Sequence, residues 1–99
     1  SKFPFAFVWV DGDLDIDLLT IDNLCRNEDI SDVETIKVCQ GTHIRTLSLT
    51  NILHQRSTDT PITLFLNEGS IDRLYMYNID TSNDKLLENR GTIGQISEV

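Results

Sequence analysis

Strict alternation of acidic and aliphatic residues over positions 13–18 is the feature that most constrains this chain. The segment reads DLDIDL. Successive side chains of a β-strand point to opposite faces, so this pattern predicts a strand with one acidic face and one aliphatic face. The three carboxylates would then form a row on the exposed face, about 7 Å apart.

A second β-rich run precedes this strand, and an Asp-Gly pair lies between them. Residues 3–10 read FPFAFVWV and are followed by Asp11-Gly12. Asp-Gly between two such runs favours a tight hairpin, because both turn residues tolerate a positive φ. A second hairpin is expected between residues 62–66 and 71–79, across a loop that contains Gly69. The sequence therefore predicts antiparallel pairing at two places.

One segment shows helical spacing instead. The i, i+3, i+4, i+7 spacing of one helix face is followed by Leu49, Ile52, Leu53 and Arg56. Ser48 could cap the first turn. We therefore expect the principal helix near residues 48–56.

Two shorter segments are also assigned. Residues 33–39 are rich in β-branched side chains and predict a strand, against the helix that a capping box at residues 31–34 would start. Residues 82–91 predict a short helix with Ser82 as its N-cap and Gly91 after its end.

Length and composition complete the fold prediction. Ninety-nine residues, 39% of them hydrophobic, allow a single domain over residues 1–99 with one modest core. We find no internal repeat and no linker. The predicted class is α+β, a single small domain of antiparallel β-hairpins with one principal helix; an all-β sandwich or small barrel is the alternative. The expected core is Phe5, Phe7, Leu14, Ile16, Leu18, Val38, Leu49, Ile52, Leu53, Leu64, Leu66, Leu74 and Met76.

Negative charge is concentrated in the first third of the chain. The net charge is -8, and residues 1–35 hold nine acidic and two basic residues, whereas residues 36–99 hold seven and six. A field of one sign attracts a basic partner and repels phosphates and anionic lipids. We therefore expect no nucleic-acid partner. No apolar run approaches the roughly 18 residues of a membrane span, so we expect no membrane partner.

The acidic string is the candidate binding site. It consists of Asp11, Asp13, Asp15, Asp17 and Asp22. Counted from Asp11, these acids fall at positions 1, 3, 5, 7 and 12 of an EF-hand-like loop, but position 6 is Ile16 where that loop needs glycine. Carboxylates in a row along a strand do not converge on an ion, so we predict no metal site and no cofactor.

Two cysteines, Cys25 and Cys39, leave two possibilities open. Spaced 14 residues apart, they could close one disulfide, worth about 3 kcal/mol in the loop-entropy model. The alternative is a pair of buried free thiols.

The sequence offers little for catalysis. It has no Gly-x-Ser-x-Gly elbow and no glycine-rich phosphate loop. Cys39 and His43 lie close together, but few cations are near enough to activate the thiol. We therefore expect a protein that is not an enzyme.

The function expected from these observations is protein binding. An acidic N-terminal hairpin would dock on a basic protein surface, as in an inhibitor, immunity or adaptor protein. The alternative is a secreted recognition subunit, bridged by Cys25–Cys39, that forms homo-oligomers or binds a receptor or glycan.

Overall fold

The computed structural model describes residues 8–26, 34–54, 61–81 and 84–98. Within these ranges the chain forms β-strands and no helix. The strands are β1 (Val8–Val10), β2 (Asp15–Asp22), β3 (Cys25–Arg26), β4 (Ile36–Val38), β5 (His43–His54), β6 (Thr63–Asn67), β7 (Ser70–Asp80), β8 (Lys85–Asn89) and β9 (Thr92–Glu98).

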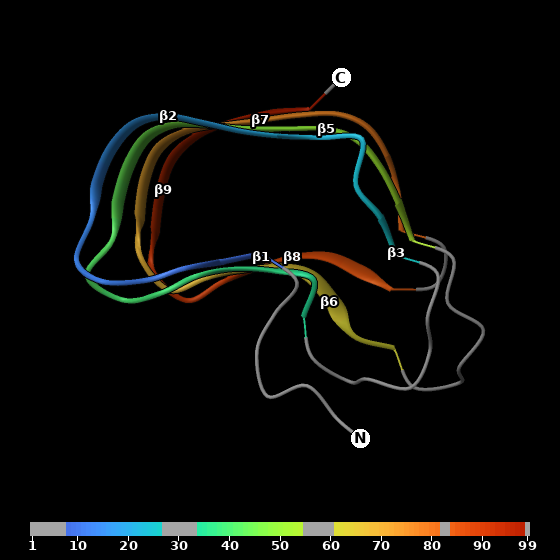
Figure 1. Cartoon of the computed structure of the whole chain (residues 1–99), viewed down its shortest axis with the longest axis horizontal. Helices are drawn as coiled ribbons and strands as arrows, with labels where there is room; N and C mark the ends of the chain where they lie inside the picture. Colours follow the sequence, from blue (N-terminus) through green and yellow to red (C-terminus); the bar gives the residue numbers. More distant parts are fainter. Residues whose placement is uncertain (1–7, 27–33, 55–60, 82–83, 99) are drawn as a thin grey trace.

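The strands build two sheets in which every pair is parallel. The first sheet has the order β1-β4-β6-β8, and the second has the order β2-β5-β7-β9 with β3 also paired to β5. Figure 1 looks along the stack, with the second sheet following one bent path over the top and left and β1, β6 and β8 below. The chain thus visits the two sheets in turn and returns one strand further each time.

This winding is a parallel β-helix of four coils. The coils comprise residues 8–26, 34–54, 61–81 and 84–98, each with a strand from both sheets. Asp15 pairs with His43, His43 with Ser70, and Ser70 with Thr92, so equivalent positions recur after 28, 27 and 22 residues. The chain therefore contains a repeat of variable length, contrary to our expectation of none.

Stacked aliphatic side chains fill the interior. Two ladders run through all four coils: Ile16, Ile44, Ile71 and Ile93 form one, and Leu19, Leu47, Leu74 and Ile96 form the other. Their members in the two middle coils are at most 1% exposed. Full burial of such a side chain contributes about 1.5–3 kcal/mol, so these ladders are a main source of stability.

An asparagine occupies the same bend in three successive coils. Asn23, Asn51 and Asn78 have φ values of 60°, 53° and 57°. Asparagine is one of the few residues that adopts this left-handed conformation readily. The Asn78 side-chain amide donates to Asn51 Oδ1 at 2.8 Å. The bend in the second sheet therefore depends on asparagine because asparagine tolerates a positive φ.

Glycines occupy the opposite bend, between the two sheets. Gly12, Gly41, Gly69 and Gly91 each follow a strand of the first sheet. A Cβ at Gly91 would lie 2.0 Å from the carbonyl oxygen of Gly69, so the two coils could not approach as they do. Gly91 must be glycine because at this bend the fourth coil packs directly on the backbone of the third.

The predicted principal helix near residues 48–56 is wrong, since residues up to His54 belong to β5. In β5 the buried residues are Ile44, Leu47, Leu49, Ile52 and His54. The spacing between successive buried residues alternates between three and two positions, because two consecutive residues point outward at each bend. Leu49 and Ile52 share the three-residue step with a helix, which explains the misreading. The short helix predicted over residues 82–91 is likewise replaced by β8 where that segment is described.

The predicted antiparallel hairpins are also wrong. The runs flanking Asp11-Gly12 are β1 and β2, which belong to different sheets, and the same holds for β6 and β7 around Gly69. The α+β class is therefore incorrect, and the all-β alternative is closer. A strand is present within residues 33–39, as β4.

The expected core is partly correct. Val38, Leu49, Ile52, Leu64, Leu66, Leu74 and Met76 are buried. Leu14 and Leu18 are instead 45% and 64% exposed, because Leu14 precedes β2 and Leu18 follows Asp17 on the outer side of a bend. Phe5 and Phe7 lie outside the described residues.

Replacing the middle asparagine separates backbone strain from hydrogen bonding. We expect Asn51→Ala to lower the free energy of unfolding by about 2 kcal/mol, since alanine is strained at this φ and the side-chain hydrogen bonds are lost. Asn51→Gly, which loses only the hydrogen bonds, should cost about 1 kcal/mol. Urea denaturation measures both variants. Equal losses would contradict the role of the left-handed backbone.

Candidate functional site

All five predicted binding aspartates are exposed and lie on the first coil. Asp11 and Asp13 occupy the turn between β1 and β2, and Asp15 and Asp17 follow on the outer face of β2. We call these four residues the acidic corner. Asp22 stands apart, at the far end of β2 beside the asparagine bend. The structure therefore brings four of the five together.

Two members of the acidic corner are paired with cations of the second coil. Arg45 forms an ion pair with Asp17, and its Nη1 is 3.4 Å from Asp15 Oδ1. His43 lies between Asp15 and Asp72, with Nδ1 and Nε2 each 3.1 Å from one carboxylate. The hydrogen bond with Asp72 is the largest cause that raises the pKa of His43 above its usual 6.5; Asp15 adds to it and desolvation opposes it.

The other two members of the acidic corner have no cation beside them in the described part of the chain. Asp11 Oδ1 accepts a hydrogen bond of 2.7 Å from the Gly12 backbone N–H. Asp13 has a left-handed φ of 56°, and its Oδ1 would lie 2.0 Å from a Cβ placed on Gly41. Both residues are exposed.

Asp22 instead forms hydrogen bonds at the asparagine bend. Its Oδ1 accepts hydrogen bonds from Thr50 Oγ1 at 2.7 Å and from Asn51 Nδ2 at 2.8 Å. The hydrogen bond from Thr50, then that from Asn51, lowers the pKa of Asp22 below its usual 3.8. These contacts join the first coil to the second, so Asp22 has a structural role.

The two cysteines are free thiols at different places in the fold. Cys25 lies exposed in β3, in the second sheet, opposite Leu53. Cys39 is buried after β4, where its Sγ accepts a hydrogen bond from Trp9 Nε1. This arrangement corresponds to the free-thiol alternative, except that only Cys39 is buried.

A chain of buried polar side chains runs through the interior, and the sequence patterns did not point to it. Its members are Arg26, Thr35, His54 and Asp84. Arg26 Nη1 donates to Thr35 Oγ1 at 3.0 Å, Thr35 Oγ1 is hydrogen-bonded to His54 Nε2, and His54 Nδ1 is 3.0 Å from Asp84 Oδ2. The other carboxylate oxygen of Asp84 accepts the backbone N–H of Ile62 at 3.0 Å. We call this set the polar chain.

In the polar chain a hydroxyl, an imidazole and a carboxylate follow one another, which is the order of groups in a catalytic triad. Because these groups are buried, we assign them a structural role. Arg26, Thr35 and His54 have no exposed surface, and the side chain of Asp84 is 4% exposed. A substrate has no access to the hydroxyl of Thr35 in this arrangement. The four residues come from three coils, so their hydrogen bonds tie those coils together.

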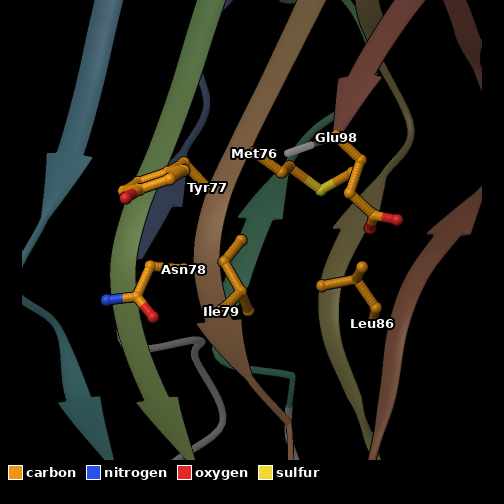
Figure 2. A pocket seen from close by; sticks show the side chains of 6 residues that line it. All are labelled: Met76, Tyr77, Asn78, Ile79, Leu86 and Glu98. Carbon is orange, nitrogen blue, oxygen red and sulfur yellow. The ribbon is translucent and has the colours of Figure 1, made fainter.

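Two open hollows lie near the last coil. One, of about 330 Å³, opens where β9 reaches Glu98 opposite Met76. Figure 2 shows Met76, Ile79 and Leu86 on one side of β7, with Tyr77 projecting to the other. The second, of about 540 Å³, lies on the outer face of the second sheet around Arg73 and Tyr75.

Among the described residues, no group of three or more His, Cys, Asp or Glu side chains is arranged to hold a metal ion. The same residues include no helix long and apolar enough to cross a membrane. Comparison of the chain with protein-family models, curated proteins and solved structures gives no match.

The raised pKa of His43 predicts a pH-dependent contribution to stability. Because the folded pKa lies above the unfolded value, the ion pairs stabilise the fold fully below about pH 6.5 and less as pH rises through the folded pKa. The free energy of unfolding of wild type should therefore exceed that of His43→Gln most at acidic pH. Denaturant titrations of both proteins across this range measure the difference, and a difference that grows with pH would refute the assignment.

Removing His54 should cost far more stability than removing His43. His54→Ala removes the imidazole that joins Thr35 to Asp84 in the interior, and we expect a loss of about 3–5 kcal/mol in the free energy of unfolding. His43→Ala is the matched control, since its side chain is partly exposed. Similar losses from the two substitutions in thermal or urea unfolding would show that the polar chain is not a structural tie.

Proposed function

We propose that the chain is a non-enzymatic protein-binding module that docks on a basic surface through the acidic corner. The observation that carries the proposal is the position of Asp11 and Asp13, exposed on the outermost described coil with no cation beside them. Asp15 and Asp17 extend the same surface. Exposed carboxylates of this kind steer a basic partner and set its orientation.

The distribution of cations supports this surface over others. Arg26 is the only basic residue within 8–26, and it is buried. In and next to the first sheet of the described chain, lysine and arginine side chains are paired with acids, as in Lys37–Glu68 and Arg90–Glu88. The negative field is therefore strongest at the first coil.

The remaining features fit a binding protein better than an enzyme. The polar chain is buried and so is closed to a substrate, and the acidic corner consists of exposed carboxylates on an outer surface. The recognition-subunit alternative draws less support, because it depends on a Cys25–Cys39 bridge and both thiols are free.

Two variants with the same net charge test the location of the binding surface. Asp11→Asn/Asp13→Asn removes both unpaired carboxylates while keeping a residue that tolerates the φ of Asp13. Glu98→Lys makes the same charge change on the last coil. With a fluorescent oligolysine peptide as the probe, we expect the double variant to bind about fivefold more weakly than Glu98→Lys.

Fluorescence anisotropy at low and physiological salt measures both affinities. The salt dependence should also be smaller for the double variant, since fewer charges meet the peptide. Equal affinities for the two variants would place the attraction in the total charge and overturn the acidic corner as the docking surface.

A further inference from the structure

The outer face of the second sheet has a hollow centred on β7. It is a shallow depression of about 540 Å³, and the residues that line its outer side are Thr46, Ser48, Arg73, Tyr75, Gln95 and Ser97. We call these six residues the Arg73 hollow. They come from the second, third and fourth coils and lie on one continuous face.

Strand register explains the shape. Arg73 lies between Thr46 and Gln95, and Tyr75 lies between Ser48 and Ser97. Neighbouring strands are about 4.8 Å apart, so small side chains flank the tyrosine ring on both sides. Arg73 and Tyr75 are two residues apart on one strand, which separates them by about 7 Å. Arg73 and Tyr75 therefore stand next to each other on the same outward face, close enough for one small ligand to contact both.

The polar side chains of the Arg73 hollow bond to none of the other residues that the structure describes. Within the described chain, Arg73 is the only exposed lysine or arginine without an ion pair. The side chains of its five companions likewise make no hydrogen bond to other described residues. The nearby bend differs, because Thr50, Asn51 and Asn78 all bond to neighbouring side chains there.

The local charge is compatible with an anionic group. Asp72 precedes Arg73 but is held by His43, and Asp17 is held by Arg45. Asp17 is the member of the acidic corner that lines a hollow with Arg73, and exposed charges farther away are screened by salt beyond about 8 Å at physiological ionic strength. Among the described residues Arg73 forms no ion pair although Asp17 and Asp72 line a hollow with it, and the planar donors of its guanidinium suit a carboxylate.

Tyr75 restricts the ligand further. Its side chain is 39% exposed, and an aromatic ring beside hydroxyl and amide groups provides one apolar surface with hydrogen-bonding groups around it. The backbone of β7 is paired on both sides at this level. A peptide cannot add to it as a strand, so recognition must come from side chains.

We propose that the Arg73 hollow binds a pyranose sugar that carries a carboxylate. The ring would pack on Tyr75, the carboxylate would meet Arg73, and the sugar hydroxyls would bond to Thr46, Ser48, Gln95 and Ser97. The Arg73 hollow contains none of the four aspartates of the acidic corner, although Asp17 lines an adjoining hollow with Thr46 and Arg73.

Titration of ¹⁵N-labelled protein tests the proposal, with methyl β-glucuronide as the probe and methyl β-glucoside as its neutral counterpart. We expect the glucuronide to shift the amide resonances of the hollow and to bind about tenfold more tightly than the glucoside. Arg73→Gln should reduce glucuronide affinity to the glucoside level. Tyr75→Ala should weaken both sugars.

Two matched variants serve as controls. Tyr77→Ala removes an exposed tyrosine of the same strand outside the hollow, and Arg90→Gln removes an exposed arginine of the first sheet. Both should bind glucuronide as wild type does, and so should Asp11→Asn/Asp13→Asn, which keeps the outcome distinct from that of the acidic corner.

Three results would overturn the proposal. One is the absence of any titrating shift in the hollow. Another is displacement of glucuronide by an equal concentration of acetate, which would indicate a site for any small anion. The third is an equal loss of affinity in Tyr77→Ala and Tyr75→Ala, which would show that the ring does not pack on Tyr75.

Discussion

Parallel pairing of each coil with the next is the constraint on which the rest of this structure depends. It places equivalent backbone positions about 4.8 Å apart, so each inward side chain must fit directly against its counterpart. Isoleucine therefore stacks on isoleucine in the ladder from Ile16 to Ile93. The same rule governs the bends, where Asn51 must adopt the conformation of Asn23 and Asn78. Core and bends thus follow from a single geometric requirement.

The same register stacks the outward side chains, and this stacking forms both the acidic corner and the Arg73 hollow. The second coil supplies His43 and Arg45 beside the aspartates of the first, so much of the acidic row is neutralised by its neighbour. In the described chain the first coil has a neighbour on one side only, and Asp11 and Asp13 keep their charge exposed. Arg73 is stacked between Thr46 and Gln95 and finds no acid in either coil.

Local pattern was enough to predict β2 and the outward direction of Asp15 and Asp17, because alternation depends on one strand alone. It failed for β5, where bends change the spacing from two to three and imitate a helix. Pairing partners were beyond local reasoning, since the repeat varies from 28 to 22 residues and hides the recurring asparagine. The polar chain could not be predicted from local pattern at all, because its four residues become neighbours only once the coils are stacked.

The polar chain also bears on how the protein unfolds. In a solenoid the backbone pairing joins each coil only to its neighbours, so coils can detach one at a time from either end. Here loss of the last coil would remove Asp84 from His54, and loss of the first would remove Arg26 from Thr35. Either step would break a hydrogen bond of the buried polar chain, at a cost of about 1–3 kcal/mol. The hydrogen bonds thereby disfavour partly frayed states and make a repetitive architecture melt as one unit.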